Sequence, residues 1–373
     1  MLDVLRWLIP PVAIAYWLAN YVRYRRAGLR RTRREYERFG TISPSVYARH
    51  YNERVPTVEE ELELWGAYHR HRHEARYDIV ARTVRAHVPV GGRVLDVGCG
   101  AMSVADRLRD LDVEYVGVDF GAPHVAYAAR KYADHGGPLR VRLGRCAAEA
   151  LPFADASADV VVFGEVIEHL IRPELAVWEI ARVLRPGGVL VLTTNNASEV
   201  PLVSPLRQPL AWVEKAVGAS MPIVISHRAW VWPERVDPAL VPEGSGDVFV
   251  PHTHHIPAET KHLLAAAGLS TIRWSSFEFP PPHSRSAKVL ERMGAAGRRA
   301  ADVVEAVAQR VPLVRRLGTH LLLIARKTGA PDAPEPPPDV WPGPFSGAGE
   351  LRRLDRARWP KPPLLPGRRR GNG

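Results

Sequence analysis

The amino-acid sequence predicts an α/β protein with a seven-stranded, doubly wound parallel sheet, and three observations indicate this class. Apolar segments of strand length alternate with helical patterns along residues 77–328. One of these strands, Arg93–Val97, runs directly into the closely spaced glycines Gly98 and Gly100. An acid, Asp119, ends the next strand, 21 residues after Gly98. In doubly wound sheets this spacing is typical of a crevice that binds a nucleoside.

Seven segments are predicted to be strands because they are short, rich in Val, Ile and Leu, and separated by helical patterns. This alternation predicts parallel strands joined by right-handed crossovers. One helix is expected at Tyr77–His87, before the first strand, and another at Ala258–Ala267. The predicted strands are Arg93–Val97, Tyr115–Val118, Leu139–Leu143, Asp159–Phe163, Gly188–Thr194, Thr271–Phe279 and Thr319–Arg326.

The turn after the first strand has the residues needed for a close approach between backbone and ligand. Gly98 and Gly100 allow a sharp turn because neither has a Cβ atom. A helix is expected to begin soon afterwards, at Ser103. Cys99, between the two glycines, is interpreted as a small residue that fits the turn and not as a nucleophile.

Composition and charge limit the possible functions. The 373 residues, 46% of them hydrophobic, suffice for one main domain with additions. The two cysteines, Cys99 and Cys146, imply no disulfide framework and indicate a reducing compartment. Residues 23–38 carry +6 and residues 351–373 carry +7 of the net charge of +11, so the remainder carries −2. A nearly neutral centre makes nucleic acid an unlikely partner, because phosphate contacts need basic side chains.

Residues 2–22 form a mostly apolar run that is predicted to be a membrane helix. Its 21 residues would span about 31 Å, close to the hydrocarbon thickness of a bilayer. Arginines follow at once, which predicts a location on the cytoplasmic face of the membrane. Two alternatives stay open, a helix packed on the protein's own core and one lying in the membrane interface, and the alternative location is cytoplasmic. A cleaved signal peptide is disfavoured because the positive charge follows the apolar run.

The predicted organisation has four parts. The main domain carries two insertions, at residues 195–250 and 284–316; the first is expected to form a lid, because long excursions at this sheet edge often do. High proline, glycine and arginine content predicts a disordered C-terminal tail. The parts are 1–24, an anchor or interfacial helix; 25–76, a basic juxtamembrane segment and helical cap; 77–328, the main domain; and 329–373, the tail.

Three titratable side chains directly follow the fourth predicted strand. Glu165, Glu168 and His169 are spaced i, i+3 and i+4, so on a helical turn they share one face. Ligands of open α/β sheets bind at the carboxyl ends of the strands, where this turn lies. The three residues are therefore the predicted catalytic residues.

The same three residues, completed by His254 and His255, could hold a divalent ion. Carboxylate and imidazole ligands fit Mg²⁺, Mn²⁺ or Zn²⁺ and do not choose among them. Such an ion would act as a Lewis acid on a hydroxyl oxygen. Two other interpretations stay open: His169 acts directly as a base or orients the substrate, or the cluster is structural.

The chain resembles class I S-adenosylmethionine-dependent methyltransferases of the methyltransferase-11/23 type. Four motifs carry this resemblance in order. They are Arg93–Met102, Ala148–Phe153, Asp159–Val162 and Ala181–Gly188. Met102 departs from the family pattern, which usually has a third glycine there, and Ala147 stands where an acid often holds the adenine amine. The alternative is a dinucleotide-binding domain with the same first turn.

The resemblance implies a Rossmann-like fold and S-adenosylmethionine as cofactor. It assigns cofactor contacts residue by residue. Asp96, Gly98, Cys99 and Gly100 would line the methionine end, Asp119 would bind the ribose hydroxyls, and Phe120 and Ala148 would flank adenine.

The Glu-x-x-Glu-His pattern at Glu165–His169 is similar to two narrower groups, quinone-biosynthesis O-methyltransferases and small-RNA 3′-terminal 2′-O-methyltransferases. This likeness implies methylation of a hydroxyl oxygen. We expect a small-molecule or lipid-like acceptor at the membrane. The alternatives are an RNA 2′-O-methyltransferase and a non-catalytic member that only binds the cofactor. The sequence predicts no oligomeric state.

Overall fold

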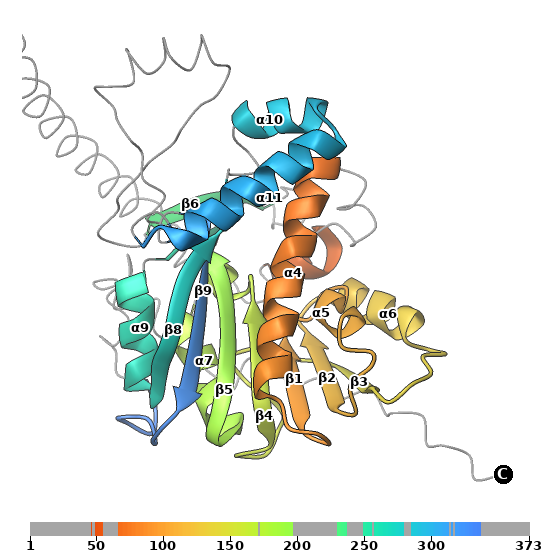
Figure 1. Ribbon diagram of the computed structural model, residues 1–373. Helices are drawn as coiled ribbons and strands as arrows, with labels where there is room; N and C mark the ends of the chain where they lie inside the picture. The colour runs from red at the N-terminus through yellow and green to blue at the C-terminus, as the bar shows by residue number, and fades with distance from the viewer. Residues whose placement is uncertain are drawn as a thin grey trace, which may run out of the picture.

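The computed structural model describes the main domain and parts of its additions (Figure 1). The described residues are 46, 49–54, 66–170, 172–196, 230–236, 249–255, 257–279, 285–312, 315 and 318–336. Within them, no helix combines the length and the apolar character needed to cross a bilayer. The predicted anchor at 1–24, most of the cap, most of the lid and the tail beyond 336 lie outside the described residues.

The predicted seven strands form one sheet, in which their order is β3-β2-β1-β4-β5-β9-β8. Neighbours pair in parallel except β9, which is antiparallel to both β5 and β8. The strands are β1 (Arg93–Val97), β2 (Glu114–Asp119), β3 (Arg140–Arg145), β4 (Ala158–Gly164), β5 (Leu184–Asn195), β8 (Leu269–Phe277) and β9 (His320–Lys327).

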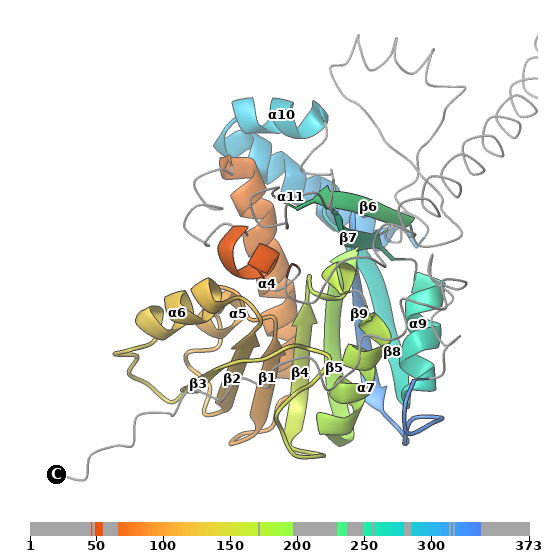
Figure 2. The same ribbon diagram turned by 180° about the vertical axis from the view of Figure 1, so that it is seen from behind.

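Helices cover both faces of this sheet, so the predicted doubly wound, Rossmann-like architecture is confirmed (Figures 1 and 2). One face packs against α4 (Ala67–His87), α5 (Ser103–Asp106) and α6 (Ala122–Lys131). The other face packs against α7 (Pro173–Val183) and α9 (Pro257–Ala266). The carboxyl ends of β1, β2 and β4 therefore lie at a common edge.

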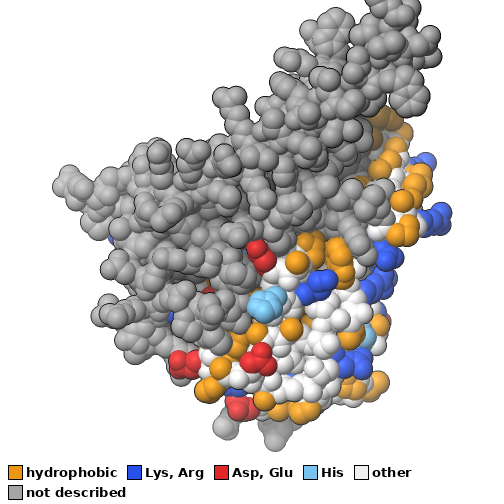
Figure 3. All heavy atoms as spheres, turned by 90° about the vertical axis from the view of Figure 1, so that its left-hand side faces the viewer, with side chains coloured by type: hydrophobic (Ala, Val, Ile, Leu, Met, Phe, Trp, Pro, Cys, Tyr) orange, Lys and Arg blue, Asp and Glu red, His pale blue; other side chains and the backbone are white. Residues whose placement is uncertain are grey.

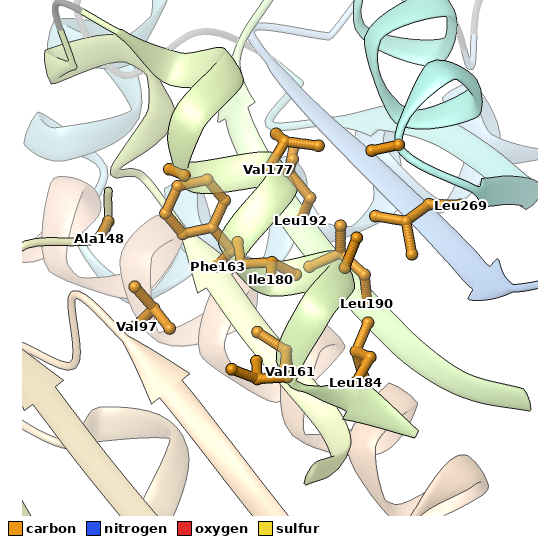
Figure 4. Close-up of a cluster of buried hydrophobic side chains, with 14 of the residues drawn as sticks. Val97, Ala148, Val161, Phe163, Val177, Ile180, Leu184, Leu190, Leu192 and Leu269 are labelled. Atoms are coloured by element: carbon orange, nitrogen blue, oxygen red, sulfur yellow. The ribbon is translucent and has the colours of Figure 1, made fainter. Parts of the chain in front are cut away.

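The α7 side of the sheet holds a continuous hydrophobic core (Figure 4). Phe163 of β4 and Leu190 of β5 are fully buried there against Ile180 of α7. Burying a side chain of this size contributes about 1.5–3 kcal/mol. These central strands are hydrophobic on both faces, which is why they read as continuous apolar runs.

The helix before β1 is longer than predicted. Instead of starting at Tyr77, α4 starts at Ala67, so the expected boundary between cap and domain at 76 falls inside one helix. Its first two turns pack against the second insertion, which forms α10 (Arg285–Arg292) and α11 (Ala295–Arg310). The Glu291 carboxylate accepts hydrogen bonds from the Ala67 and Tyr68 amides at 2.9 and 2.7 Å. A distant residue thus caps a helix whose own sequence offers no cap.

An antiparallel ribbon, formed by part of the first insertion and the residues that follow it, was not predicted from the sequence. Strands β6 (Trp230–Arg235) and β7 (Phe249–His254) pair so that Pro233 stands opposite Pro251. Proline argues against strands in the middle of a sheet but is tolerated at edges. Both strands of this two-stranded ribbon are edges, and Figure 2 shows the ribbon above the sheet near the end of β5.

The C-terminal tail starts later than predicted. Residues 329–336 pack on the domain: the Asp332 amide donates to the Ala266 carbonyl at 2.8 Å, and Trp178 Nε1 donates to the Ala333 carbonyl at 3.0 Å. The prediction of disorder from residue 329 was therefore wrong for these eight residues.

Truncating Leu190 should test the packing of the central strand. Leu190→Ala is expected to lower the free energy of unfolding by about 2–5 kcal/mol, because it leaves a cavity in a fully buried layer. Chemical denaturation measures the change. The matched control, Ile272→Ala at a half-exposed site of β8, should shift it by no more than about 0.5 kcal/mol. Equal effects of the two changes would contradict the layering.

Candidate active site

The glycine turn after β1 packs directly on the turn after β4. Gly98 has φ of +78°, and a Cβ atom there would lie 2.1 Å from Val166 Cγ2. The Gly98 and Cys99 amides donate to the Val118 carbonyl at 2.8 and 3.0 Å. A Cβ atom on Gly100, with φ of +46°, would meet nothing within 4 Å. The turn is therefore closed toward Val166 and open at Gly100.

Met102 does not fill the open side of this turn. It adopts a left-handed conformation with φ of 60° before α5 and is fully buried. Its Sδ atom would lie 2.5 Å from a Cβ atom on Gly117 of β2, so the thioether packs into the core under α4. The departure from the family's third glycine is thus accommodated away from the space beside Gly100.

Asp119, at the end of β2, is hydrogen-bonded to the glycine turn. Its Oδ2 accepts a hydrogen bond from the Gly100 amide at 3.0 Å, and its Oδ1 accepts one from the Gly121 amide at 2.8 Å. Each carboxylate oxygen can accept a further bond. Asp119, the residue predicted to bind the ribose hydroxyls, is therefore in direct contact with the glycine turn.

Asp96 is placed differently from the other predicted cofactor residues. It is buried within β1 and accepts a hydrogen bond of 2.5 Å from the Tyr115 hydroxyl. Burial raises the pKa of Asp96 to about 7, although the bond from Tyr115 acts to lower it. Its role beside the methionine end stays a prediction.

Backbone contacts bring Phe120 and Ala148 to the same edge. The Cys146 amide donates to the Asp119 carbonyl at 3.2 Å, and Arg145 Nε donates to the Phe120 carbonyl at 3.0 Å. Asn52, from the turn η1 (His50–Arg54), accepts bonds from the Ala122 amide at 2.9 Å and from Arg145 at 3.0 Å. The adenine-flanking assignment stays a prediction, and Asn52 is a contact that no sequence pattern indicated.

Glu165 stands in a buried cluster of four charged residues. It has φ of +56°, and its carboxylate lies 3.1 Å from His320 Nε2 and 3.5 Å from an Arg76 guanidinium nitrogen. The other ring nitrogen of His320 lies 2.7 Å from Glu278, which is 4.0 Å from Arg76. These four residues, from α4, the turn after β4, the end of β8 and the start of β9, are called the charge cluster.

The charge cluster stabilises both carboxylates and the imidazolium. Burial acts to lower the pKa of His320, but Glu165 and Glu278 raise it to about 10. Burial acts to raise the pKa of Glu278, but His320 and Arg76 lower it to about 2. The pKa of Glu165 is likewise lowered by His320 and Arg76 against the effect of burial. Two positive and two negative groups thus balance in a desolvated site.

Glu168 is buried apart from this cluster. Thr194 Oγ1 donates to its Oε2 at 2.9 Å, and Asn195 Nδ2 lies 3.5 Å from its Oε1. Burial, and then the nearby Glu165 carboxylate, raise the pKa of Glu168. The predicted common face of Glu165, Glu168 and His169 is therefore wrong, because Glu165 precedes the 3₁₀ turn η2 (Ile167–His169) and adopts a left-handed conformation.

Rings gather around His169 at the carboxyl edge of the sheet. Its imidazole meets the Tyr51 ring edge to face at 6.0 Å and the His252 ring at 4.7 Å. Asn195 Nδ2 lies 2.6 Å from His252 Nε2, where it can donate a hydrogen bond. The structure thus places Tyr51 of the predicted cap and His252 of β7 beside a predicted catalytic residue.

The predicted metal site is not assembled. Within the described residues, no group of three His, Cys, Asp or Glu side chains is arranged to hold an ion. Burial lowers the pKa of His255 to about 3, and its amide donates to the Asn195 carbonyl. His254 is also largely desolvated, which lowers its pKa. The five predicted ligands Glu165, Glu168, His169, His254 and His255 have separate contacts instead.

Comparisons with known proteins agree with this geometry. Residues 95–192 match the family described as methyltransferase domain. This region contains the glycine turn, Asp119 and the turn after β4. This part of the chain is thus similar to methyltransferase domains.

Curated relatives match over part of their length. A probable S-adenosylmethionine-dependent methyltransferase of Mycolicibacterium smegmatis is 37% identical over 142 residues, 38% of this chain and 49% of that protein. The ubiquinone biosynthesis O-methyltransferase of Cereibacter sphaeroides is 29% identical over 203 residues, 54% of this chain and 69% of that protein. The chain spans about half the length of several curated relatives that it matches, the Mycolicibacterium protein among them.

Among solved structures, the chain is similar to the CcbJ methyltransferase from Streptomyces caelestis. The TM-score is 0.44 and the sequences are 18% identical. The match covers 77% of this chain and 100% of that chain.

The charge cluster should make stability depend on pH in the alkaline range. The folded-state pKa of His320, about 10, lies above its ordinary value of 6.5. The contribution of His320 to the free energy of unfolding is therefore complete below about pH 6.5 and is lost as the pH rises through about 10. Urea unfolding should show that the free energy of unfolding declines between pH 6 and 10. In His320→Gln this decline should be smaller. The control His262→Gln, at an exposed position of α9, should leave the decline unchanged. An unchanged decline in His320→Gln would contradict the assignment.

Proposed function

We propose that the protein is an S-adenosylmethionine-dependent methyltransferase that methylates a hydroxyl oxygen of a small-molecule or lipid-like acceptor. The observation that carries this proposal is the hydrogen bond between the Gly100 amide and Asp119, with open space beside Gly100, next to the turn that bears Glu165 and His169. The match of residues 95–192 to the methyltransferase domain supports the reaction class. The name of the Cereibacter relative supports oxygen as the methylated atom.

The crevice has features that fit this cofactor. The open space beside Gly100 gives a ligand access to the backbone. Asp119 is anchored by two amides and keeps acceptor capacity for two ribose hydroxyls. When bound, S-adenosylmethionine supplies an electrophilic methyl group on a sulfonium. The amide bonds at Asp119 hold its carboxylate in place before the ligand arrives, which reduces the entropic cost of binding.

The residues on the acceptor side would orient the hydroxyl group and remove its proton. Oxygen forms the new bond to carbon as the carbon–sulfur bond breaks, and the hydroxyl proton passes to His169 as general base. The rings of Tyr51 and His252 would restrict the acceptor's approach. Alignment of this kind supplies much of the rate in methyl transfer. A metal ion has no part in this proposal, because Glu165 and Glu168 are engaged elsewhere.

Cofactor binding should depend on Asp119. Asp119→Asn is expected to weaken binding of S-adenosylhomocysteine by about tenfold to a hundredfold, because charged hydrogen bonds contribute about 1.5–3 kcal/mol. Isothermal titration calorimetry measures the dissociation constant. The matched control is Asp112→Asn, at an exposed acid before β2, which should bind like the wild type. Unaltered affinity in Asp119→Asn would exclude the crevice as the nucleoside site.

Methyl transfer should depend on His169 more than cofactor binding does. His169→Gln is expected to lower the turnover of labelled methyl into a lipid or small-molecule fraction of cell extract by about 10²–10⁴-fold. Its affinity for S-adenosylhomocysteine should stay within about twofold of the wild type, since His169 lies on the acceptor side. Full turnover in the variant would contradict the assignment of the base. Label incorporated into RNA instead would contradict the acceptor class.

Removing divalent ions should not abolish turnover. Enzyme dialysed against a chelator is expected to keep its full rate, because the predicted metal ligands are separated in the structure. The same labelling assay measures this, with zinc, magnesium and manganese added back singly as controls. Loss of activity that one of these ions restores would contradict the proposed reaction.

A further inference from the structure

The outer face of α11 combines exposed apolar and basic side chains. Val303 and Val307 are 63% and 53% exposed, and Arg299 and Arg310 are also exposed. Their spacing of four, four and three residues places all four on one side of the helix. Val304 and Val311 add exposed apolar surface beside them. A soluble protein rarely leaves such a row uncovered without a binding role.

α10 continues this surface. Val289 and Met293 are 41% and 50% exposed, next to the exposed Lys288 and Arg292. Gly297 lets the two helices approach closely, because a Cβ atom there would lie 2.0 Å from the Leu290 carbonyl oxygen. The outer surface of α10 and α11 is called the helical-pair face. Figure 3 shows apolar and basic spheres side by side along the upper right margin, which corresponds to the side nearest the viewer in Figure 1, where α11 is drawn in front of α4.

The acids of α10 and α11 make their contacts with α4. Glu291 accepts the first amides of α4. Asp302 lies 2.8 Å from His71 Nε2, and Glu305 lies 2.5 Å from Arg72. Within the described part of the chain, Lys288, Arg292, Arg299 and Arg310 take part in no ion pair. The acids of the two helices are thus paired with α4, whereas these four basic side chains are exposed.

We propose that the helical-pair face docks on an anionic lipid bilayer. Valine and methionine between arginines suit an interfacial helix, whose apolar residues enter the acyl boundary while its arginines meet lipid phosphates. A second copy of the chain is a poorer occupant, because a symmetric contact would bring like charges together. Nucleic acid would leave the valines without a partner. The basic segments 23–38 and 351–373 have the same charge complementarity to such a surface.

The full chain can be tested with vesicles of phosphatidylcholine alone and with added phosphatidylglycerol. A polarity-sensitive dye at Val303→Cys reports on α11 itself, because Cys99 and Cys146 are buried. The emission should shift to the blue with the anionic vesicles only. The same dye at Ile272→Cys, a half-exposed apolar site of β8, should not shift.

Charge and apolarity are then removed separately. Arg299→Glu with Arg310→Glu, and Val303→Asp with Val307→Asp, should each weaken vesicle co-sedimentation by at least about tenfold. The matched control Ile272→Asp with Arg273→Glu should leave it unchanged. All variants should bind S-adenosylhomocysteine like the wild type. Membrane docking is thereby tested independently of the proposed methyl transfer.

Three outcomes would overturn the proposal. The first is no shift at position 303 with anionic vesicles, even if the chain sediments with them through another segment. The second is a shift without vesicles that disappears on dilution, since it would reveal a second copy as the occupant. The third is an equal loss of binding in the β8 control.

Discussion

The contact between the turns after β1 and β4 constrains the whole site. Gly98 can have no side chain because Val166 occupies the position of its Cβ atom. The residue before Val166, Glu165, adopts a left-handed conformation that costs energy for a side chain of this type. On one side of this contact lies the crevice bounded by Gly100 and Asp119; on the other lie His169 and the rings around it. Cofactor and acceptor would meet at the contact itself.

The charge cluster stabilises the turn after β4, because Glu165 directly precedes Val166 and is paired with residues of other elements. Arg76, His320 and Glu278 reach Glu165 from three other elements, and all four residues are desolvated. Removing one partner from such a cluster typically costs about 3–5 kcal/mol, because an uncompensated charge stays buried. The elements that hold the turn are therefore the long helix α4 and the antiparallel pair of β8 and β9. Arg72, one turn before Arg76 on α4, is in turn held by Glu305 of α11.

Local pattern predicted the sheet because each strand has its own apolar run and its own turn residues. The approximate positions of the seven strands and the position of Asp119 at the end of β2 followed from short segments. The helical pattern of the predicted cap and the predicted helix Tyr77–His87 were assigned to separate parts, whereas the structure joins the last residues of the cap to that helix as α4. The β6–β7 ribbon was missed because its prolines argue against strands.

The site was harder to predict because its chemistry depends on residues far apart in sequence. The glycine turn and Asp119 could be found from spacing, and the structure places them in hydrogen-bonding contact. The predicted metal site is not assembled in the structure, because the Glu165 carboxylate contacts His320 instead. His320 lies 155 residues further along the chain and belongs to no motif. Arg76 and Glu278 were missed for the same reason. A buried cluster assembled from four elements leaves no periodic trace in the sequence.

A crystal structure of the full chain grown with S-adenosylhomocysteine tests the central claim most directly. The account predicts electron density for the nucleoside between Gly100 and Asp119, with both ribose hydroxyls within hydrogen-bonding distance of the Asp119 carboxylate. Density for the nucleoside elsewhere in the molecule, with this crevice free of it, would contradict the account.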